Sequence, residues 1–422
     1  MIYHKSTLEN GLRIITVPQK NTKAVTVLVL VGTGSKYEKK EINGISHFLE
    51  HMYFKGTKKR PSTQLIAETL DKVGGIYNAF TGEEYTGYFA KVASPYLDLA
   101  LDWVSDIFLN SILPEKEAEK EKGVIIEEIN MIYDHPMNYI QTLWMKLLYG
   151  DQPAGWDIAG TKETVSKINR EKLTDYMKKQ YVASNTIISI AGNFDEKAAI
   201  SKVKRYFPKM KTTEPIEKPK VVEKQNKPEI LLHFRKTDQT HLCFGVRTFN
   251  FFHPQRYTLD LLAVILGGMM SSRLFIEVRD KLGIAYYIRT HSDMNPDTGF
   301  LFTQAGLDNK NVEKGILTIL KEHKKTSQKL VPQNELKKAK DYLKGKMTLL
   351  LEPSDAQASF YASQELLEKK ILTPEEVYRK IDKVSQKDIL RVAKEIFRPE
   401  KLNLALIGPF KNKQKFQRLL KL

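Results

Sequence analysis

The chain has 422 residues, of which 41% are hydrophobic and 28% are charged, a balance typical of a soluble protein with two or three globular domains. Its formal net charge is +17, but the Lys and Arg residues are scattered and no aromatic-basic pattern accompanies them, so we expect a solvated basic surface and no specific nucleic-acid partner. The single cysteine, Cys243, excludes an intrachain disulfide, and without an apolar leader or a run of 18 apolar residues we expect a cytoplasmic protein with no membrane contact.

Short runs rich in apolar and β-branched residues predict strands, with helical patterns between them. Several of these strands follow one another without a long crossover, which favours mostly antiparallel or mixed sheets covered by helices. The predicted fold class is therefore α+β. The strand-like runs are residues 12–17, 25–31, 85–92 and 186–191 in the first half of the chain and residues 230–234, 240–246, 284–290, 299–303 and 402–407 in the second.

The two halves of the chain look like copies of one plan. Residues 168–194 align with residues 384–410 without a gap, so that Gly192 meets Gly408. In both segments an amphipathic helix, a short turn and an apolar strand follow in the same order. The pattern predicts a duplicated domain and not a solenoid repeat.

A linker separates the two copies. Residues 212–228 are rich in Pro, Lys and Glu and lack periodic apolar positions, which is typical of an extended segment. We therefore predict two homologous α+β domains, residues 1–211 and residues 229–422, each with a sheet covered by helices.

A His-x-x-Glu-His motif gives the first domain its chemistry. His47, Glu50 and His51 stand at positions i, i+3 and i+4 of a predicted helix and so share one face. Two neutral imidazoles can hold one zinc ion, and a catalytic zinc takes three protein ligands and keeps one position for water. Packed or surface histidines would not explain why the apolar residues form a separate stripe. That stripe consists of Ile45, Phe48, Leu49 and Met52.

A later helical segment offers the third ligand. Its apolar stripe contains Val124, Ile125 and Ile132. Glu128 falls on this stripe, whereas Glu127 falls on the polar side. A carboxylate on a buried stripe needs a partner, because burying an unpaired charge is expensive. We therefore predict that Glu128, not Glu127, completes the zinc site.

Glu121 lies on the same face as Glu128, two helical turns earlier. The distance along the axis is about 10 Å, too far to share the metal. Glu121 could orient a ligand histidine or a bound water. It could equally be a carboxylate of the first helical turn or a surface charge, and the sequence leaves these readings open.

These residues resemble the pitrilysin-type zinc metallopeptidases, whose inverted motif is followed about 75 residues later by two glutamates seven apart. The likeness covers nearly the whole chain, and its length is similar to that of the short-chain branch that includes mitochondrial processing peptidase. The resemblance implies one zinc ion per chain, held by His47, His51 and Glu128. It also implies that Glu50 is the general base of an endopeptidase that hydrolyses extended peptides.

Two further motifs match this family. Asn78, Ala79 and Phe80 stand in a segment that is similar to the edge strand on which the family pairs substrate backbone. Arg279 and Tyr286, seven residues apart, are similar to its substrate-clamping pair, and Tyr286 would assist the oxyanion. Without the resemblance, Arg279 would be a surface charge and Tyr286 an ordinary strand aromatic.

The resemblance also implies a dimer, because two chains of the short-chain branch together make one enzyme. A homodimer is favoured since one chain carries both motif sets, while a heterodimer with a related chain stays open. Two other functions remain, a non-catalytic subunit of a processing-peptidase-like complex and a basic nucleic-acid-binding protein with a structural zinc. The complete ligand set speaks against the first, and a glutamate ligand with only one cysteine speaks against the second.

Overall fold

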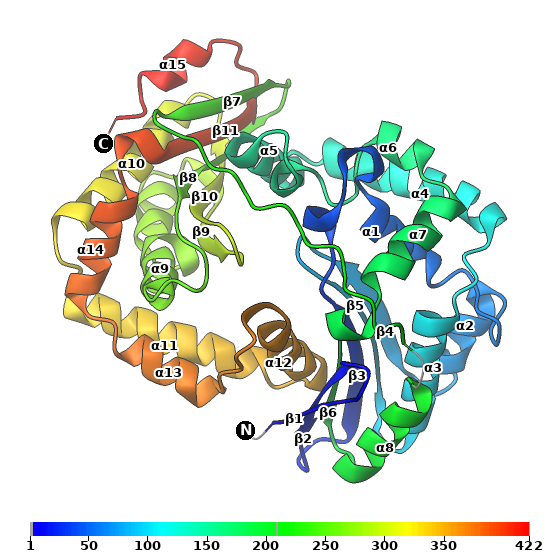
Figure 1. The fold of residues 1–422 in the computed structure, drawn as a ribbon. Helices are drawn as coiled ribbons and strands as arrows, with labels where there is room; N and C mark the ends of the chain where they lie inside the picture. Colours follow the sequence, from blue (N-terminus) through cyan, green and yellow to red (C-terminus); the bar gives the residue numbers. More distant parts are fainter. Residues whose placement is uncertain (1–2, 208–209, 422) are drawn as a thin grey trace. The chain divides into compact units, whose positions relative to one another are not determined.

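The computed structural model describes residues 3–207 and 210–421, whose course Figure 1 shows. The chain folds into two compact units, and each contains one mixed sheet covered by helices, which confirms the predicted α+β class. Unit 1 comprises Met1–Asn130, Trp156–Pro219 and Thr348–Pro374. Unit 2 comprises Met131–Gly155, Lys220–Met347 and Glu375–Leu422.

Unit 1 is built on a six-stranded sheet with the order β1-β2-β6-β3-β5-β4. Only β2 and β6 are parallel neighbours, and every other pair is antiparallel. The two faces of the sheet pack against α3 and α12, so the central strand β3 reads as a nearly continuous run of β-branched and leucine residues. The strands are β1 (His4–Thr7), β2 (Arg13–Pro18), β3 (Ala24–Val31), β4 (Ile76–Thr81), β5 (Thr86–Ala93) and β6 (Thr186–Gly192).

Two long helices contain a boundary between the units within their length. These are α4 (Glu115–Asp134) and α11 (Gln333–Leu350). The other helices of unit 1 are α1 (Ile45–Met52), α2 (Thr63–Asp71), α3 (Leu97–Asn110), α6 (Lys162–Lys167), α7 (Arg170–Gln180), α8 (Glu196–Tyr206) and α12 (Ser354–Glu368).

Unit 2 is built on a five-stranded sheet with the order β7-β11-β8-β10-β9, in which only β7 and β11 are parallel. Helix α5 covers one face, where Trp144 stacks on Phe302 with ring centroids 5.7 Å apart. The strands are β7 (Glu229–Phe234), β8 (Gln239–Arg247), β9 (Ala285–Met294), β10 (Gly299–Asp308) and β11 (Leu402–Gly408). The remaining helices are α5 (Pro136–Tyr149), α9 (Arg256–Ala263), α10 (Val312–Gln328), α13 (Pro374–Asp382), α14 (Gln386–Ile396) and α15 (Lys413–Gln417).

The strand order of unit 2 repeats that of unit 1. Strands β7, β11, β8, β10 and β9 correspond in order and direction to β2, β6, β3, β5 and β4, as expected of a duplicated domain. In each copy a long helix, α4 or α11, is followed by a shorter one, α5 or α12. These shorter helices are exchanged, since α5 packs on the second sheet and α12 on the first.

The exchange makes the compact units differ from the predicted ranges 1–211 and 229–422, which treat each domain as continuous in sequence. Each predicted strand is present, although β9 and β10 run four and five residues past the predicted ends. Strand β1 was not predicted. Strand β4 was expected only through the family resemblance, and it does lie at the edge of its sheet.

Residues 212–228 contain no helix or strand, as predicted for the linker, but they are tied down on both sides. Lys218 pairs with Glu84 at 2.5 Å, and the side-chain amide of Gln180 donates to the carbonyl of Ile216. Further along, the backbone of Val222 exchanges hydrogen bonds of 2.9 Å in both directions with the side chain of Gln152. The linker is therefore held by contacts along its length and is not a freely extended segment.

The basic charge is unevenly divided. Unit 2 contains 36 Lys and Arg residues against 21 Asp and Glu residues, whereas unit 1 contains 31 and 29. Most of the net charge of +17 therefore belongs to unit 2. Within the two described stretches, no helix has the length and apolar character needed to cross a bilayer.

We expect the buried His323 of α10 to make the stability of the fold sensitive to acid. It is fully buried, it stacks on Phe397 with ring centroids 4.1 Å apart, and neither ring nitrogen has a hydrogen-bond partner among residues 3–207 and 210–421. Burial lowers its pKa to about 3. In the unfolded chain His323 has its ordinary pKa of about 6.5, so as the pH falls it is protonated there before it is protonated in the folded protein. The free energy of unfolding is therefore not reduced by His323 above a pH of about 6.5, and it falls by about 2 kcal/mol at pH 5.

A His323→Leu variant should lose part of that dependence. We expect the difference in the free energy of unfolding between pH 7.5 and pH 5 to shrink by about 2 kcal/mol, measured by urea titration at both values. The exposed His135, changed to Gln, serves as the control and should leave the difference as it is. An equal difference in both variants would show that His323 is not the group responsible.

Candidate metal centre

Helix α1 separates an apolar face from a polar one. Its four predicted core residues, Ile45, Phe48, Leu49 and Met52, are all fully buried, which confirms the predicted stripe. His47 and His51 stand on the other face with 18% and 16% of their side chains exposed. The amphipathic pattern therefore fixes which side of α1 carries the histidines.

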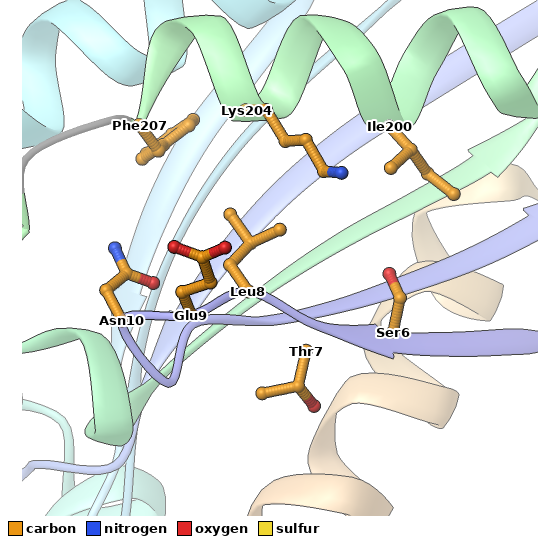
Figure 2. Close-up of a pocket in the computed structure, with 8 residues that line it drawn as sticks. All are labelled: Ser6, Thr7, Leu8, Glu9, Asn10, Ile200, Lys204 and Phe207. Carbon is orange, nitrogen blue, oxygen red and sulfur yellow. The ribbon is translucent and has the colours of Figure 1, made fainter.

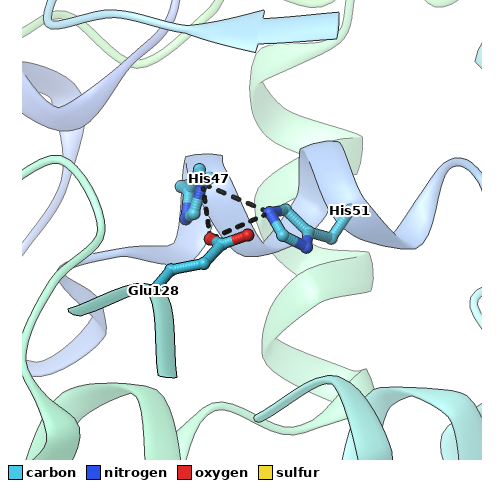
Figure 3. Close-up of side chains that lie close together, drawn as sticks. All are labelled: His47, His51 and Glu128. Atoms are coloured by element: carbon cyan, nitrogen blue, oxygen red, sulfur yellow. Dashed lines mark hydrogen bonds and ion pairs between the residues drawn. The ribbon is translucent and has the colours of Figure 1, made fainter. Parts of the chain in front are cut away.

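The two histidines meet Glu128 of α4, and the three side chains point toward one another (Figure 3). Nε2 of His47 lies 3.2 Å from Nε2 of His51, and Oε2 of Glu128 lies 3.6 and 3.5 Å from these two nitrogens. Ligands about 2.0–2.1 Å from a tetrahedral zinc lie about 3.3 Å apart. Three atoms with these separations fit three corners of such a site, and the donor set of two imidazoles and one carboxylate suits zinc.

Glu121 lies behind the histidines. Its Oε1 is 2.9 Å from Nδ1 of His51, and its Oε2 is 2.7 Å from Nζ of Lys55. A ligand histidine commonly donates its second ring N–H to a carboxylate, which sets the tautomer and the ring orientation. Of the readings left open for Glu121, this geometry favours orientation of a histidine. For His47, by contrast, the buried Nδ1 has no partner in the described part of the chain.

The predicted apolar stripe of α4 is wrong at one position. Val124 is 47% exposed, whereas Ile125 is fully buried and Glu121 is 5% exposed. The side chain of Glu128 is 36% exposed, so it borders the apolar face and does not lie within it. Glu127 is exposed, as predicted. The difference arises because the face of α4 that packs on the core of unit 1 is centred on Ala118 and Ile125, with Ile126 and Ile129 beside them, and Val124 points about 100° away from Ile125 around the helix axis.

The pKa values of the two histidines are shifted in opposite directions. Burial, together with the neighbouring His51, lowers the pKa of His47 to about 4, so its imidazole is neutral at physiological pH. Burial also lowers the pKa of His51, but the hydrogen bond to Glu121 and the nearby carboxylates raise it overall. The carboxylates that favour the charged form of His51 would also favour a bound cation.

Glu50 stands beside the three ligands with one of its oxygens engaged. The hydroxyl of Thr81, the last residue of β4, donates to its Oε2 at 2.5 Å. Burial raises the pKa of Glu50, and the charge of Glu128 adds to this, while the Thr81 hydrogen bond and His51 oppose it. Such a carboxylate is suited to accept and release a proton. Sequence reasoning gave no role to Thr81, although it directly follows Asn78–Phe80, and it missed Lys55, which stands four residues after His51.

Strand β4, which carries the predicted substrate-binding residues, has an open side. Among the residues that the structure describes it pairs with β5 alone, and it forms one edge of the sheet. The N–H of Ala79 donates to the side-chain oxygen of Asn78 at 2.9 Å. Asn78 is exposed, Ala79 is 8% exposed, and Phe80 is half-buried on the face that packs against α12.

Arg279 and Tyr286 lie in unit 2, whereas the metal ligands lie in unit 1. Arg279 belongs to the π-helical segment Phe275–Lys281, and its guanidinium lies over the ring of Phe275 at 4.9 Å. Tyr286 is 74% exposed on β9, the edge strand that corresponds to β4.

A separate cavity of about 640 Å³ lies between the end of β1 and helix α8, as Figure 2 shows. It shares no residue with the metal cluster. Its lining is mixed, with Glu9 and Lys204 as the charged groups. The lining residues are Ser6, Thr7, Leu8, Glu9, Asn10, Ile200, Lys204 and Phe207.

Two family descriptions match consecutive parts of the chain. Residues 13–162 match Insulinase (Peptidase family M16), and residues 167–343 match Peptidase M16 inactive domain. His47, His51 and Glu128 all fall within the first match. The second match has no counterpart of the zinc motif, in keeping with its description.

Relatives of similar length are called zinc proteases. The chain is 37% identical over 410 residues to uncharacterized zinc protease YmxG of Bacillus subtilis, covering 96% of this chain and 98% of the relative. It is 34% identical over 408 residues to an uncharacterized zinc protease of Rickettsia felis, with the same coverage of both chains.

Two crystal structures share the fold. A protease from Helicobacter pylori matches with a TM-score of 0.90 at 25% identity, covering 97% of this chain and 99% of that one. A peptidase M16 inactive domain from Pseudomonas fluorescens matches with the same TM-score at 15% identity, covering 97% and 98%, and this likeness shows the fold alone.

Proposed function

The chain belongs to peptidase family M16, the pitrilysin-type family, and we propose that it is a zinc-dependent endopeptidase that hydrolyses extended peptides or unfolded polypeptide segments. The observation that carries the proposal is the triangle of two imidazole nitrogens and one carboxylate oxygen with Glu50 beside it. In this proposal His47, His51 and Glu128 hold one zinc ion per chain.

The roles of the protein groups follow from this arrangement. A zinc ion held there supplies Lewis-acid chemistry toward a water molecule and the scissile carbonyl. Glu50 takes the proton of the attacking water and delivers it to the leaving amine nitrogen as the C–N bond breaks. Thr81 holds one oxygen of Glu50 in place, and Glu121 sets the ring of His51.

The open edge of β4 supports an extended substrate. A peptide that adds as a further strand would gain backbone hydrogen bonds, including one to the N–H of Ala79 once the Asn78 side chain gives way. Backbone pairing of this kind accepts many sequences but demands an unfolded chain. We therefore propose broad selectivity for side chains and exclusion of folded proteins.

Incubation of the purified protein with a mixed peptide library tests this function. Cleavage should stop when a chelator removes zinc and return when one equivalent of zinc is restored, with the products identified by mass spectrometry. Bound zinc without any cleavage would indicate a non-catalytic subunit. Bound zinc without cleavage but with retained nucleic acid would indicate the structural-zinc alternative.

We propose further that the protein is a homodimer in which Arg279 and Tyr286 of one chain serve the metal centre of the other. Mixing a His51→Ala variant with a Tyr286→Phe variant tests this. Each variant alone should be weakly active, whereas random pairing should give one intact site in half of the dimers, about a quarter of the parent activity. No recovery despite subunit exchange, followed by native mass spectrometry, would mean that the second chain is not a copy of the first or that each chain completes its own site.

A further inference from the structure

The buried carboxylate of Glu38 accepts hydrogen bonds from the first turn of α1, the helix that carries the two histidines. Glu38 is 3% exposed, and its Oε2 accepts the N–H of Gly44 at 2.7 Å and the side-chain amide of Asn43 at 2.9 Å. Its Oε1 accepts the N–H of Ser46 at 2.8 Å. Burial raises the pKa of Glu38 to about 7, and the hydrogen bonds from Ser46, Gly44 and Asn43 oppose that shift.

Helix α1 depends on this contact because it is short and has no cap of its own. It contains eight residues, and its N-cap position is Gly44, which has no side chain to accept a hydrogen bond. The first N–H groups of any helix have no partner within the helix, and a carboxylate there also interacts favourably with the helix dipole. Glu38 takes the place of the missing cap, and the Ser46 N–H that it holds directly precedes His47.

The segment that contains Glu38 is hydrogen-bonded to the turn between β4, the proposed substrate-binding strand, and β5. The N–H groups of Ser35 and Lys36 donate to the carbonyls of Gly82 and Glu83 at 3.2 and 3.0 Å. Gly82 and Glu83 are the first two residues of the turn between β4 and β5, directly after Thr81. Glu38 follows this anchored segment and so joins the β4–β5 turn to the start of α1.

The start of α1 has little freedom to settle elsewhere. Gly44 has φ of +96°, and a Cβ there would lie 2.5 Å from the carbonyl oxygen of Ala159. The hydroxyl groups of Ser46 and Tyr176 lie 2.8 Å apart, and all of these groups are buried. A loss of the Glu38 contact would therefore leave the N–H groups of Gly44 and Ser46 without their acceptor unless α1 moved against this packing.

We propose that Glu38 is a positioning residue of the metal centre, which sets how α1 lies against the β4–β5 strand pair and thereby where the Nε2 atoms of His47 and His51 stand. It touches neither the metal nor the substrate. The proposal rests on the proposed zinc site. It goes beyond the ligand set, because it makes zinc affinity depend on a residue nine positions before the first ligand.

Zinc affinity of Glu38→Gln and Glu38→Asp variants tests the proposal, measured by competition with a chelating dye. The amide of Gln turns N–H groups toward one of the helix donors, and Asp keeps the charge but is too short to reach both. We expect the dissociation constant for zinc to rise about 10-fold or more in Glu38→Gln and less in Glu38→Asp. The visible spectrum of the cobalt-substituted protein should shift in the same order, since it reports ligand geometry.

Glu41→Gln is the matched control, because Glu41 is an exposed carboxylate on the same connecting segment. It should leave both zinc affinity and the cobalt spectrum unchanged. If Glu38→Gln does not fold, Glu38→Asp carries the test, with its smaller expected rise in the dissociation constant for zinc. Variants that melt at a lower temperature without metal, yet bind zinc and cobalt like the parent, would overturn the proposal and make Glu38 merely structural. A parent protein that binds no zinc would instead refute the proposed function.

Discussion

A Glu50→Gln variant should bind zinc as the parent does and lose about 10²–10⁴-fold in the rate of peptide hydrolysis. Glutamine keeps the size of the side chain and can still accept the hydroxyl of Thr81, so α1 and the three ligands keep their positions. An amide cannot take a proton from the attacking water. The loss should therefore appear in kcat, with KM little changed, because Glu50 acts on the reacting water and not on substrate binding.

Two measurements decide this result together. Zinc content by elemental analysis establishes that the site is intact, and turnover of a fluorogenic peptide establishes the loss. Glu127→Gln, an exposed carboxylate on α4, provides the control and should hydrolyse the peptide at the parent rate. Turnover of Glu50→Gln within a few-fold of the parent would assign the base to another group.

A Glu128→Gln variant should lose most of its zinc. The neutral amide oxygen is a poor replacement for a carboxylate that lies 3.5 and 3.6 Å from the two imidazole nitrogens. Removal of groups that only orient a ligand weakens metal affinity about 10–100-fold, so removal of a ligand should exceed that range. His51→Ala should behave in the same way, because it removes a ligand and leaves Glu121 without its partner.

Glu127→Gln again makes the comparison sharp, since it changes the same chemistry one residue away. It should keep a full equivalent of zinc in a dialysed sample, whereas Glu128→Gln should keep little. Equal zinc content in the two variants would contradict the assignment of the third ligand.

The helical period of the sequence predicted much of the arrangement of the metal centre. The stripe of α1 left His47, Glu50 and His51 on one face by geometry alone, and the structure has that face. The stripe of α4 was less reliable, because apolar residues occur on more than one side of this helix and their pattern does not reveal which side faces the core. Val124 is apolar and yet exposed.

Other parts of the site depend on contacts between distant segments, which no local pattern contains. Thr81 reaches Glu50 across 31 positions of sequence, and the contact becomes visible only when β4 lies beside α1. In the sequence Glu38 resembles any charged residue of a loop, and only the structure shows that its carboxylate accepts the N–H of Gly44. The exchange of α5 and α12 was hidden for the same reason, since an apolar face on a helix does not reveal which sheet it covers.

Because of that exchange, neither half of the chain contains a complete domain. A gene for residues 1–211 alone would encode the first sheet without α12, and would leave Leu28, Leu30 and Ile187 without the helix that covers them. It would also encode α5 without the sheet on which Trp144 stacks. Neither half of the chain, expressed alone, would therefore supply every helix that covers its own sheet.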